Sequence, residues 1–411
     1  MSAFLTLPAS PSGEVAAVVG PRLLAGLGTG PGIFEHRALW PATRALDEAQ
    51  LLALLDAVPV HGRGGAGFPF ARKVRATVEA GRRREIVVNA SEGEPGSAKD
   101  SALLVAAPHL VLDGADAVAH ALDADLVHVV VGHDRPAALM ALDVALGERD
   151  GDFADVEVHV TRAPFIGGQA SAVLELLDGR DNLPVTSWSP AAVAGLRGRP
   201  TLLSNAETFA HVAALLALGP NGYAELGTPG EPGTTLLTVA GDGPNGVVLE
   251  VPFGVGLGSV LEYCGYPPDC ALLLGGYHGT WVPQGHAPHL PVSRRDLAAL
   301  GLTLGAGVVL PLGARTCPVT VTAGVTGYLA GASAGRCGPC RNGLPALAQA
   351  VSALAGGAGR TATRRIHELV GLLPGRGACA HPDGTARLVR SLLAAFPEEV
   401  RAHELGTCST A

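Results

Sequence analysis

The sequence is poor in charged and aromatic residues. Only 16% of its 411 residues are charged and 4% are aromatic, whereas 47% are hydrophobic, mostly Ala, Leu and Val. It has no excess of positive charge, because 29 Lys and Arg stand against 37 Asp and Glu, a net charge of −8. Nucleic-acid binding needs clustered positive charge, so we expect no nucleic acid as partner. The hydrophobic share is typical of packed domains rather than of a disordered chain.

The sequence also lacks the features of export and of membrane insertion. A secretory signal carries Lys or Arg ahead of its apolar residues, whereas residues 1–20 of this chain do not. Two long uncharged stretches, 297–314 and 316–335, are interrupted by Gly, Thr and Pro, so they predict a buried strand and helix. We therefore expect a cytoplasmic protein without a transmembrane segment, which meets a membrane only through a partner. Seven cysteines, an odd number, favour metal or redox chemistry over a disulfide framework.

The pattern changes along the chain, and its length suits two to four domains. Strand-like runs alternate with helical stretches up to residue 225, which predicts an α/β unit over 1–225. The Gly- and Pro-rich stretch 226–233 predicts a linker. Short strands and one helix predict a small unit over 234–314, and amphipathic helices predict a helical unit over 316–411.

Two polar loops in the first unit indicate a ligand site. The glycine-rich segment 62–67 lies between two helical patterns, and its backbone can turn sharply and point N–H groups at an anion. An ordinary turn between helices has the same composition. Lys73 follows at helical distance, and the acidic loop 89–100 follows a predicted strand. Ligands of α/β proteins bind at strand ends, so the two loops together predict a phosphate cradle.

In this order the motifs resemble the NADH-binding flavoprotein subunit of respiratory complex I. The same family supplies the flavin subunits of NAD-reducing hydrogenases and of NAD-dependent formate dehydrogenases. The segments that carry the resemblance are GRGGAGFP at 62–69, NASEGEPGSAKD at 89–100, Pro108-His109, Asp113-Gly114, FIGG at 165–168, Leu174-Glu175, Gly195-Leu196 and RPTLLSNAET at 199–208. The order holds from about residue 46 to residue 396. The resemblance implies an α/β fold class with a Rossmann-like FMN-binding domain, a β-grasp soluble-ligand-binding domain and a C-terminal helical bundle carrying an iron-sulfur site.

The resemblance also implies the residues that hold FMN. They are Gly62, Arg63, Gly64, Gly65, Gly67, Lys73, Asn89, Ser91, Glu92, Phe165, Gly168, Gln169, Ser204, Asn205 and Thr208. A flavin needs an anion cradle, partners for its ribityl chain and polar groups around its ring, and these residue types supply them.

The NADH contacts of the family are only partly kept. Phe68 and Glu94 match, whereas the other aromatic and acidic contacts align with Val74, Ala76, Gln169, Ala170, Ser187 and Pro190. Loss of a stacking aromatic or of a hydrogen-bonding acid weakens binding by about 1–3 kcal/mol each. The sequence therefore leaves NADH binding open: the pocket has lost it, or other residues such as Phe70 or Trp188 have rebuilt it.

The cysteines of the helical unit predict an iron-sulfur site. Cys337 and Cys340 open a helix and Cys379 lies between later helices, so two local thiolates and one remote thiolate are available for a cluster. The family has a further cysteine where this chain has Ala334. The three thiolates hold either a three-iron cluster or a four-iron cluster with another ligand, for which Ser333, His381 and Cys408 are the candidates. Cys264, Cys270 and Cys317 are predicted to be buried thiols.

The resulting hypothesis is an electron-transfer flavoprotein similar to NADH dehydrogenase. We expect it to pass electrons between FMN and a 4Fe-4S or 3Fe-4S cluster, and on to a redox protein that is either ferredoxin-like or a membrane-bound carrier. Three different functions remain open: an NADH dehydrogenase subunit with a rebuilt pocket, a dithiol protein and a cofactor-free scaffold. The dithiol function rests on Cys-Gly-Pro-Cys at 337–340, which is also the thioredoxin tetrapeptide.

Overall fold

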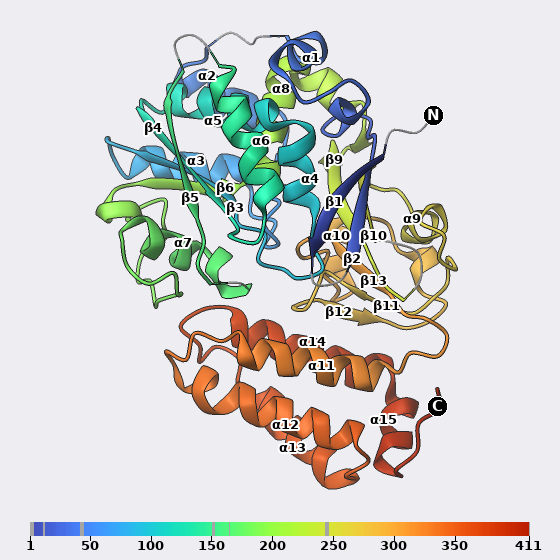
Figure 1. Cartoon of the computed structure of the whole chain (residues 1–411). Helices are drawn as coiled ribbons and strands as arrows, with labels where there is room; N and C mark the ends of the chain where they lie inside the picture. The colour runs from blue at the N-terminus through green and yellow to red at the C-terminus, as the bar shows by residue number, and fades with distance from the viewer. Residues whose placement is uncertain are drawn as a thin grey trace.

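The chain forms three parts, which are visible in Figure 1 as a helix-covered sheet, a second sheet beside it and a bundle of helices below both. The computed structural model describes residues 4–10, 13–41, 45–149, 153–163, 165–242 and 246–410. A parallel sheet, a mixed sheet and C-terminal helices follow one another as the sequence predicted, so the fold class is confirmed.

The first part is built on a parallel sheet with the strand order β5-β4-β3-β6. Its strands are β3 (Glu85–Ala90), β4 (Leu126–Val131), β5 (Asp155–Val160) and β6 (Thr201–Asn205). The central strands β3 and β4 are rich in buried valine, as expected where helices cover both faces of a parallel sheet. The edge strand β5 alternates valine with Glu157 and His159 and is largely exposed.

Helices surround this sheet. They are α1 (Ile33–Leu39), α2 (Glu48–Ala57), α3 (Phe70–Glu79), α4 (Lys99–Ala106), α5 (Pro108–Ala121), α6 (Pro136–Gly147), α7 (Ala170–Leu177) and α8 (Ala206–Ala224). Asp47 and Gln50 form a reciprocal capping box at the start of α2. Residues 99–121 form two helices, α4 and α5, with a break at Ala107. Pro108 lacks an N–H group and starts a new helix there.

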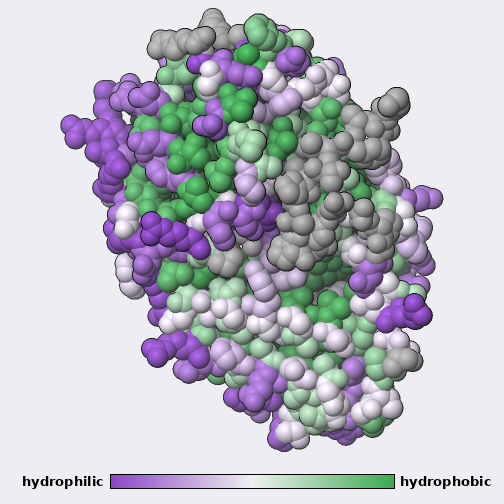
Figure 2. All heavy atoms as spheres, in the orientation of Figure 1, coloured by the Kyte–Doolittle hydropathy of each residue, from purple (hydrophilic) through white to green (hydrophobic). Residues whose placement is uncertain are grey.

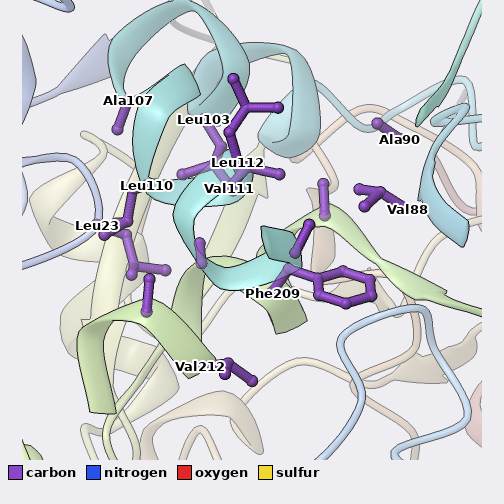
Figure 3. Close-up of a cluster of buried hydrophobic side chains, with 14 of the residues drawn as sticks. Leu23, Val88, Ala90, Leu103, Ala107, Leu110, Val111, Leu112, Phe209 and Val212 are labelled. Carbon is purple, nitrogen blue, oxygen red and sulfur yellow. The ribbon is translucent and has the colours of Figure 1, made fainter. Parts of the chain in front are cut away.

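Aliphatic side chains from α4, α5, α8 and β3 fill the core of this part. Figure 3 shows Leu103, Val111, Phe209 and Val88 converging on one cluster, and all four are fully buried. The helices α5 and α8 cross closely at Gly114, where a Cβ atom would lie 1.9 Å from the carbonyl oxygen of Phe209. Only glycine fits there, so this contact fixes the position of α8.

The second part is a seven-stranded sheet with the order β1-β2-β10-β9-β13-β11-β12. Its strands are β1 (Phe4–Ser10), β2 (Gly13–Val18), β9 (Thr234–Val239), β10 (Gly246–Pro252), β11 (Leu272–Leu274), β12 (Thr280–Val282) and β13 (Val308–Pro311), with α9 (Leu257–Tyr263) and α10 (Arg294–Ala299) beside them. Because β2 pairs in parallel with β10, the N-terminal strands belong to this sheet. The grouping of 1–225 into one unit is corrected accordingly.

The predicted linker 226–233 is also not a plain linker. It contains the short antiparallel pair β7 (Gly227–Thr228) and β8 (Glu231–Pro232). The buried carboxylate of Glu231 then accepts hydrogen bonds from Ser293 and from the backbone of Arg294. These contacts attach the connection to the start of α10.

The third part is the helical bundle α11 (Pro318–Gly331), α12 (Leu344–Ala355), α13 (Arg360–Leu372), α14 (His381–Ala395) and α15 (Pro397–Glu404). A π-helical turn at Pro339–Gly343 precedes α12. Leu347, Ile366 and Leu388 form the centre of its core, to which Phe165 and Trp281 from the other two parts also belong. The three parts therefore share packed side chains where they meet.

The surface and the helix lengths add two observations. Figure 2 shows hydrophobic residues gathered over the upper part of the drawn face, where Figure 1 labels α4, α5 and α6; on α6, Met140 and Val144 are exposed. Among the described helices, none alone combines the length and apolarity needed to span a membrane. Only α4 and α5 together meet that criterion, with a bend of 93° between them.

Candidate functional site

A cavity lies at the carboxyl ends of β3 and β6, the edge at which parallel sheets bind ligands. Ten of the predicted residues line it: Arg63, Gly64, Asn89, Ser91, Glu92, Glu94, Phe165, Gly168, Gln169 and Asn205. Seven predicted residues are not part of its wall: Gly62, Gly65, Gly67, Phe68, Lys73, Ser204 and Thr208. The structure thus brings together residues from separated stretches of sequence.

The glycine-rich loop is both a turn between helices and a wall of the cavity. It connects α2 to α3, and a bridge between His61 and Pro69 closes its base. The backbone N–H of Arg63 donates to Thr208 Oγ1 (3.0 Å), so Thr208 holds the loop from behind rather than facing the cavity. Gly65 and Gly67 adopt positive φ angles, which glycine tolerates.

The acidic loop is organised by Glu92. Its carboxylate accepts hydrogen bonds from the backbone N–H groups of Asp100 (2.8 Å) and Ser101 (3.1 Å), at the N-terminus of α4. It also accepts from the hydroxyls of Ser97 (2.9 Å) and Ser101 (2.5 Å). A carboxylate at a helix N-terminus is favoured by the helix dipole. Glu92 therefore shapes the cavity wall, and its carboxylate is already occupied by protein donors.

Three helices begin at the cavity: α4 with Lys99, α7 after the N-cap Gln169, and α8 after the N-cap Asn205. Their dipoles and first N–H groups favour a negatively charged group between them. The Asn205 side-chain nitrogen donates to the carbonyl of Asn89 (3.0 Å) and to Asp100 Oδ2 (2.7 Å). Asn89 in turn donates to the carbonyl of Gly168 (2.8 Å), which ties the α7 loop to the strand end.

A buried charge network supports the base of the cavity. Lys99 Nζ lies 2.7 Å from Asp100 Oδ1 and 3.0 Å from Glu207 Oε2. Burial raises the pKa of Asp100 to about 6, although the Lys99 charge opposes this shift. Burial also opposes ionisation of Glu207, but Lys99 and other neighbours outweigh it and hold the pKa of Glu207 well below its usual range. Glu207 is thus a fixed negative charge.

The chain has only two lysines: Lys99 lines the cavity, and Lys73 lies outside its wall. Lys73 Nζ donates to the carbonyl of Leu203 (2.8 Å) on β6, and burial lowers the pKa of Lys73. With the N-termini of α7 and α8 and the amide of Asn89, the site offers donors of the kind that a flavin phosphate and ribityl chain need. The residues present fit FMN.

Glu94 lies at the junction with the second sheet. Its Oε1 accepts a hydrogen bond from the backbone N–H of Tyr277 (3.0 Å). Burial raises the pKa of Glu94 to about 7, although backbone hydrogen bonds from Tyr277 and Gly96 oppose the shift. A Cβ atom on Gly276 would lie 2.5 Å from the Glu94 carboxyl carbon, so this turn approaches Glu94 because it lacks a side chain.

Of the two predicted nicotinamide contacts, Glu94 lines the cavity and Phe68 does not. Phe68 is 44% exposed and packs beside Arg72, with 5.4 Å from the guanidinium carbon to the ring centroid. Phe70 is buried in the core against Phe209, and Trp188 is 95% exposed. Neither of the two aromatics that were candidates for a rebuilt pocket lines the cavity.

The three predicted cluster cysteines lie close together at the start of α12 and before α14. The thiols of Cys337, Cys340 and Cys379 are near enough to one another to interact electrostatically. Burial raises the pKa of Cys340 to about 11. Among the described residues, the groups whose ligand atoms all lie within 4.8 Å of one another do not include this trio. Thiol groups separated in this way suit an iron-sulfur cluster better than a single metal ion.

The candidates for a further cluster ligand are placed differently. His381 is fully buried, and its ring nitrogens contact His278 Nε2 (3.1 Å) and the carbonyl of Leu329 (2.8 Å). Cys408 lies beside Cys317, which caps the far end of α11. In this structure both side chains are committed elsewhere, and Ser333 is half-buried in the loop after α11.

Sequence reasoning missed six residues of the cavity wall, namely Gly93, Ser97, Lys99, Asp100, His278 and Ala306. Four of them stand in the acidic loop that was recognised as a motif, so its full length was the available signal. His278 and Ala306 come from the second part of the chain. Only the folded arrangement of the two sheets places them here.

Two family models match separate parts of the chain. Residues 55–214 match the model of the Nuo51 FMN-binding domain. Residues 320–403 match the model of the NADH-ubiquinone oxidoreductase-F iron-sulfur binding region. The first range contains all the cavity residues except His278 and Ala306, and the second contains the three cysteines.

Whole-chain comparisons extend further. The F subunit of NADH-quinone oxidoreductase from Streptomyces coelicolor is 30% identical over 379 residues, covering 88% of this chain and 84% of that protein. A second F subunit of this enzyme, from Rhizobium meliloti, is 28% identical, covering 90% of this chain and 92% of that protein. A crystal structure of NAD+-reducing [NiFe]-hydrogenase in the H2-reduced state matches with a TM-score of 0.82 and 29% identity, over 93% of this chain and 67% of that chain.

Proposed function

Since this chain belongs to the family of NADH-quinone oxidoreductase F subunits, we propose that it passes electrons between a two-electron donor other than NADH and a one-electron redox partner. It does so as an FMN- and iron-sulfur-dependent electron-transfer flavoprotein. When bound, FMN takes up two electrons together and the iron-sulfur cluster carries one at a time. The residues of this chain position the two groups and separate them from water.

One observation carries the proposal: Gln169 belongs to both sites. It lines the cavity, and its side chain lies near enough to Cys379 to lower the pKa of that thiol, although burial has the larger, opposite effect. A second contact runs beside it, because Phe165 on the cavity wall packs against His381, two residues after Cys379, with ring centroids 5.5 Å apart. The flavin pocket and the cysteine trio therefore share a wall, so electrons would cross only a packed interface.

For the flavin we assign the phosphate end to the N-termini of α7 and α8 and to the glycine-rich loop. Asn89 is placed to hydrogen-bond the ribityl chain, Asn205 holds the Asn89 strand end in position, and Lys99 supplies the nearby positive charge. Gly168 lets the α7 loop approach the strand end, because a Cβ atom there would lie 2.4 Å from Ser91 Oγ. These assignments rest on the positions and donor types of the residues.

Weak use of NADH is the second component of the proposal. Gln169 and Ala170 stand where the family has acids, and Ser187 and Pro190 are not among the residues that line the cavity. With the exposed position of Phe68, the pocket offers no aromatic ring for stacking except Phe165 among the residues that line it. Glu94 is the remaining acidic contact.

The partner follows from the family. Relatives are named as subunits, and a hydrogenase supplies a similar structure, so a redox protein bound beside the cysteine trio is the proposed acceptor. Whether it is ferredoxin-like or membrane-bound stays a prediction, as does the cytoplasmic location. Cys337 is half-buried, so a partner can approach it there.

The proposal is tested by the absorption spectrum of protein purified without oxygen, recorded before and after NADH and then after dithionite. We expect flavin and iron-sulfur bands that dithionite bleaches quickly and NADH bleaches slowly. Rapid, saturable bleaching by NADH at about 1 μM–1 mM would overturn the NADH component. Trp188→Ala is the matched variant: slower NADH bleaching in it would indicate that Trp188 folds over bound NADH.

The same samples test the cofactor-free scaffold and the dithiol protein. Protein that binds no FMN and contains no iron would support the scaffold. Protein without iron but with a Cys337–Cys340 disulfide would support the dithiol function. Flavin together with iron excludes both.

A further inference from the structure

Four side chains of metal-binding type meet at the end of the helical bundle remote from the cysteine trio. They are Cys317, Glu399, His403 and Cys408, and their ligand atoms all lie within 4.8 Å of one another. The first three are buried, with exposed fractions of 8%, 7% and 4%. The proposed electron-transfer function uses none of them.

Separate elements supply the four groups. Cys317 is the N-cap of α11, at the point where the chain enters the bundle. Glu399 and His403 stand one turn apart on α15, and Cys408 follows in the tail. Cys317 and Cys337 flank opposite ends of α11, whose 14 residues span about 21 Å, so this group is distinct from the cluster cysteines.

The distances match one tetrahedral ion. Cys317 Sγ lies 3.2 Å from His403 Nε2 and 3.5 Å from Glu399 Oε1, and the latter two atoms are 3.2 Å apart. Ligands at the usual zinc distances of about 2.0–2.3 Å and tetrahedral angles would be about 3.4–3.8 Å apart. A slight outward movement of each side chain is enough to admit the ion.

The surrounding hydrogen bonds orient these atoms inward. His403 Nδ1 contacts the carbonyl of Ala355 (3.2 Å), so Nδ1 carries the proton and Nε2 turns its lone pair to the group. The hydroxyl of Ser409 donates to Glu399 Oε2, and Oε1 accepts from the Ser409 backbone N–H (3.3 Å) and faces Cys317. Cys317 is the N-cap residue of α11, so its sulfur lies at the positive end of the helix dipole.

We propose that Cys317, Glu399, His403 and Cys408 bind a single zinc ion that attaches α15 and the tail to the start of α11. Two sulfurs, an imidazole and one carboxylate suit zinc, whereas magnesium and calcium prefer oxygen ligands alone. All four positions are filled by protein, which is typical of a structural rather than a catalytic zinc site.

The test begins with metal analysis of the full chain, purified without oxygen and equilibrated with one equivalent of zinc chloride before desalting. We expect about one zinc per chain, retained beside the iron. Cys408→Ser and His403→Ala should each lower zinc retention at least about tenfold and leave iron unchanged. Two matched controls, Cys264→Ser at another buried thiol and His367→Ala at an exposed histidine, should retain zinc.

X-ray absorption at the zinc edge of the unaltered protein gives an independent result, because iron does not contribute to it. We expect two sulfur and two lighter ligands around zinc. The proposal is overturned if zinc shows fewer than two sulfurs, if no zinc is retained, or if mass spectrometry finds Cys317 and Cys408 joined in a disulfide. It is also overturned if Cys337→Ser removes the zinc.

Discussion

The imidazoles of His278 and His381 are hydrogen-bonded to each other, with 3.1 Å between His278 Nε2 and His381 Nδ1. His278 lines the cavity, and His381 is the first residue of α14, two positions after Cys379. Because His381 Nε2 donates to the carbonyl of Leu329, its Nδ1 accepts, and the proton between the rings belongs to His278. The pair thus joins the cavity wall to the cysteine region in one defined tautomeric arrangement.

This pair should make stability depend on pH. Burial, with the charges of His381 and Arg387, lowers the pKa of His278 to about 3, whereas an unfolded histidine has a pKa of about 6.5. As pH falls below 6.5, the unfolded state therefore takes up a proton that folded His278 does not, and stability decreases. His278→Gln removes this contribution. The free energy of unfolding of the variant should lie below that of wild type at pH 7, and this difference should become smaller as the pH falls to 4. Urea unfolding measures it; a deficit independent of pH would contradict the assignment.

Glu94 should show the opposite dependence. Its pKa of about 7 lies above the value of 4.5 for an exposed glutamate, so ionisation costs stability as pH rises from 4.5 through 7. Glu94→Gln should therefore stabilise the FMN-free protein at pH 8, by at most about 3 kcal/mol, and change little at pH 4. Thermal unfolding at the two pH values is the measurement. Glu262→Gln, on the exposed face of α9, should show no such difference.

Much of the site was predictable because its residues stand in contiguous motifs at strand ends. Asn89 and Asn205 stand at the ends of valine- and leucine-rich strands, where an amide side chain indicates a ligand site. The direction of a side chain was not predictable: Phe70 and Trp188 look alike as candidate stacking groups, yet the first is buried in the core and the second points to solvent. Packing decides this, and sequence spacing does not encode it.

Contacts between residues far apart in the sequence were the other feature that could not be predicted. The pairing of β2 with β10 depends on a register that no local pattern specifies, so the N-terminal strands were grouped with the wrong sheet. His278 reaches the cavity for the same reason, through the packing of the second sheet against the first. Cys317 was correctly expected to be buried, but its neighbours on α15 became visible only in the fold.

The role of Glu92 gives a third prediction. Its carboxylate accepts from Ser97, Asp100 and Ser101, so Glu92→Ala leaves the start of α4 without its partner and loosens the acidic loop. Loss of hydrogen bonds to a charged group costs about 1.5–3 kcal/mol, and FMN affinity should fall about tenfold or more. Quenching of FMN fluorescence during titration gives the affinity. Glu92→Gln keeps the shape of the side chain and one acceptor oxygen, so its FMN affinity should lie between those of wild type and Glu92→Ala. Unchanged FMN binding by Glu92→Ala would contradict this role.

The fourth prediction concerns Ala334, which lies in the loop after α11 and packs into the same core as Cys337. Three cysteines leave one corner of a four-iron cluster without a thiolate, and His381 and Cys408 are engaged elsewhere. Such a corner exchanges its ligand easily, so iron should be lost on exposure to oxygen. Ala334 stands three residues before Cys337, the spacing at which consecutive thiolates reach separate irons.

Ala334→Cys should therefore retain about four irons per chain after exposure to air, and should give a four-iron signal by electron paramagnetic resonance after reduction. Ala332→Cys is the control, because it adds a thiol at the end of α11 outside that spacing and should leave iron retention as in wild type. Iron and sulfide analysis of all three proteins measures the effect. A dithiol protein would behave otherwise: neither wild type nor Ala334→Cys would hold iron, and reducing agents would open a Cys337–Cys340 disulfide. If neither wild type nor Ala334→Cys contains iron, even when purified without oxygen, the cluster is excluded, since the added thiolate supplies the one ligand that was missing.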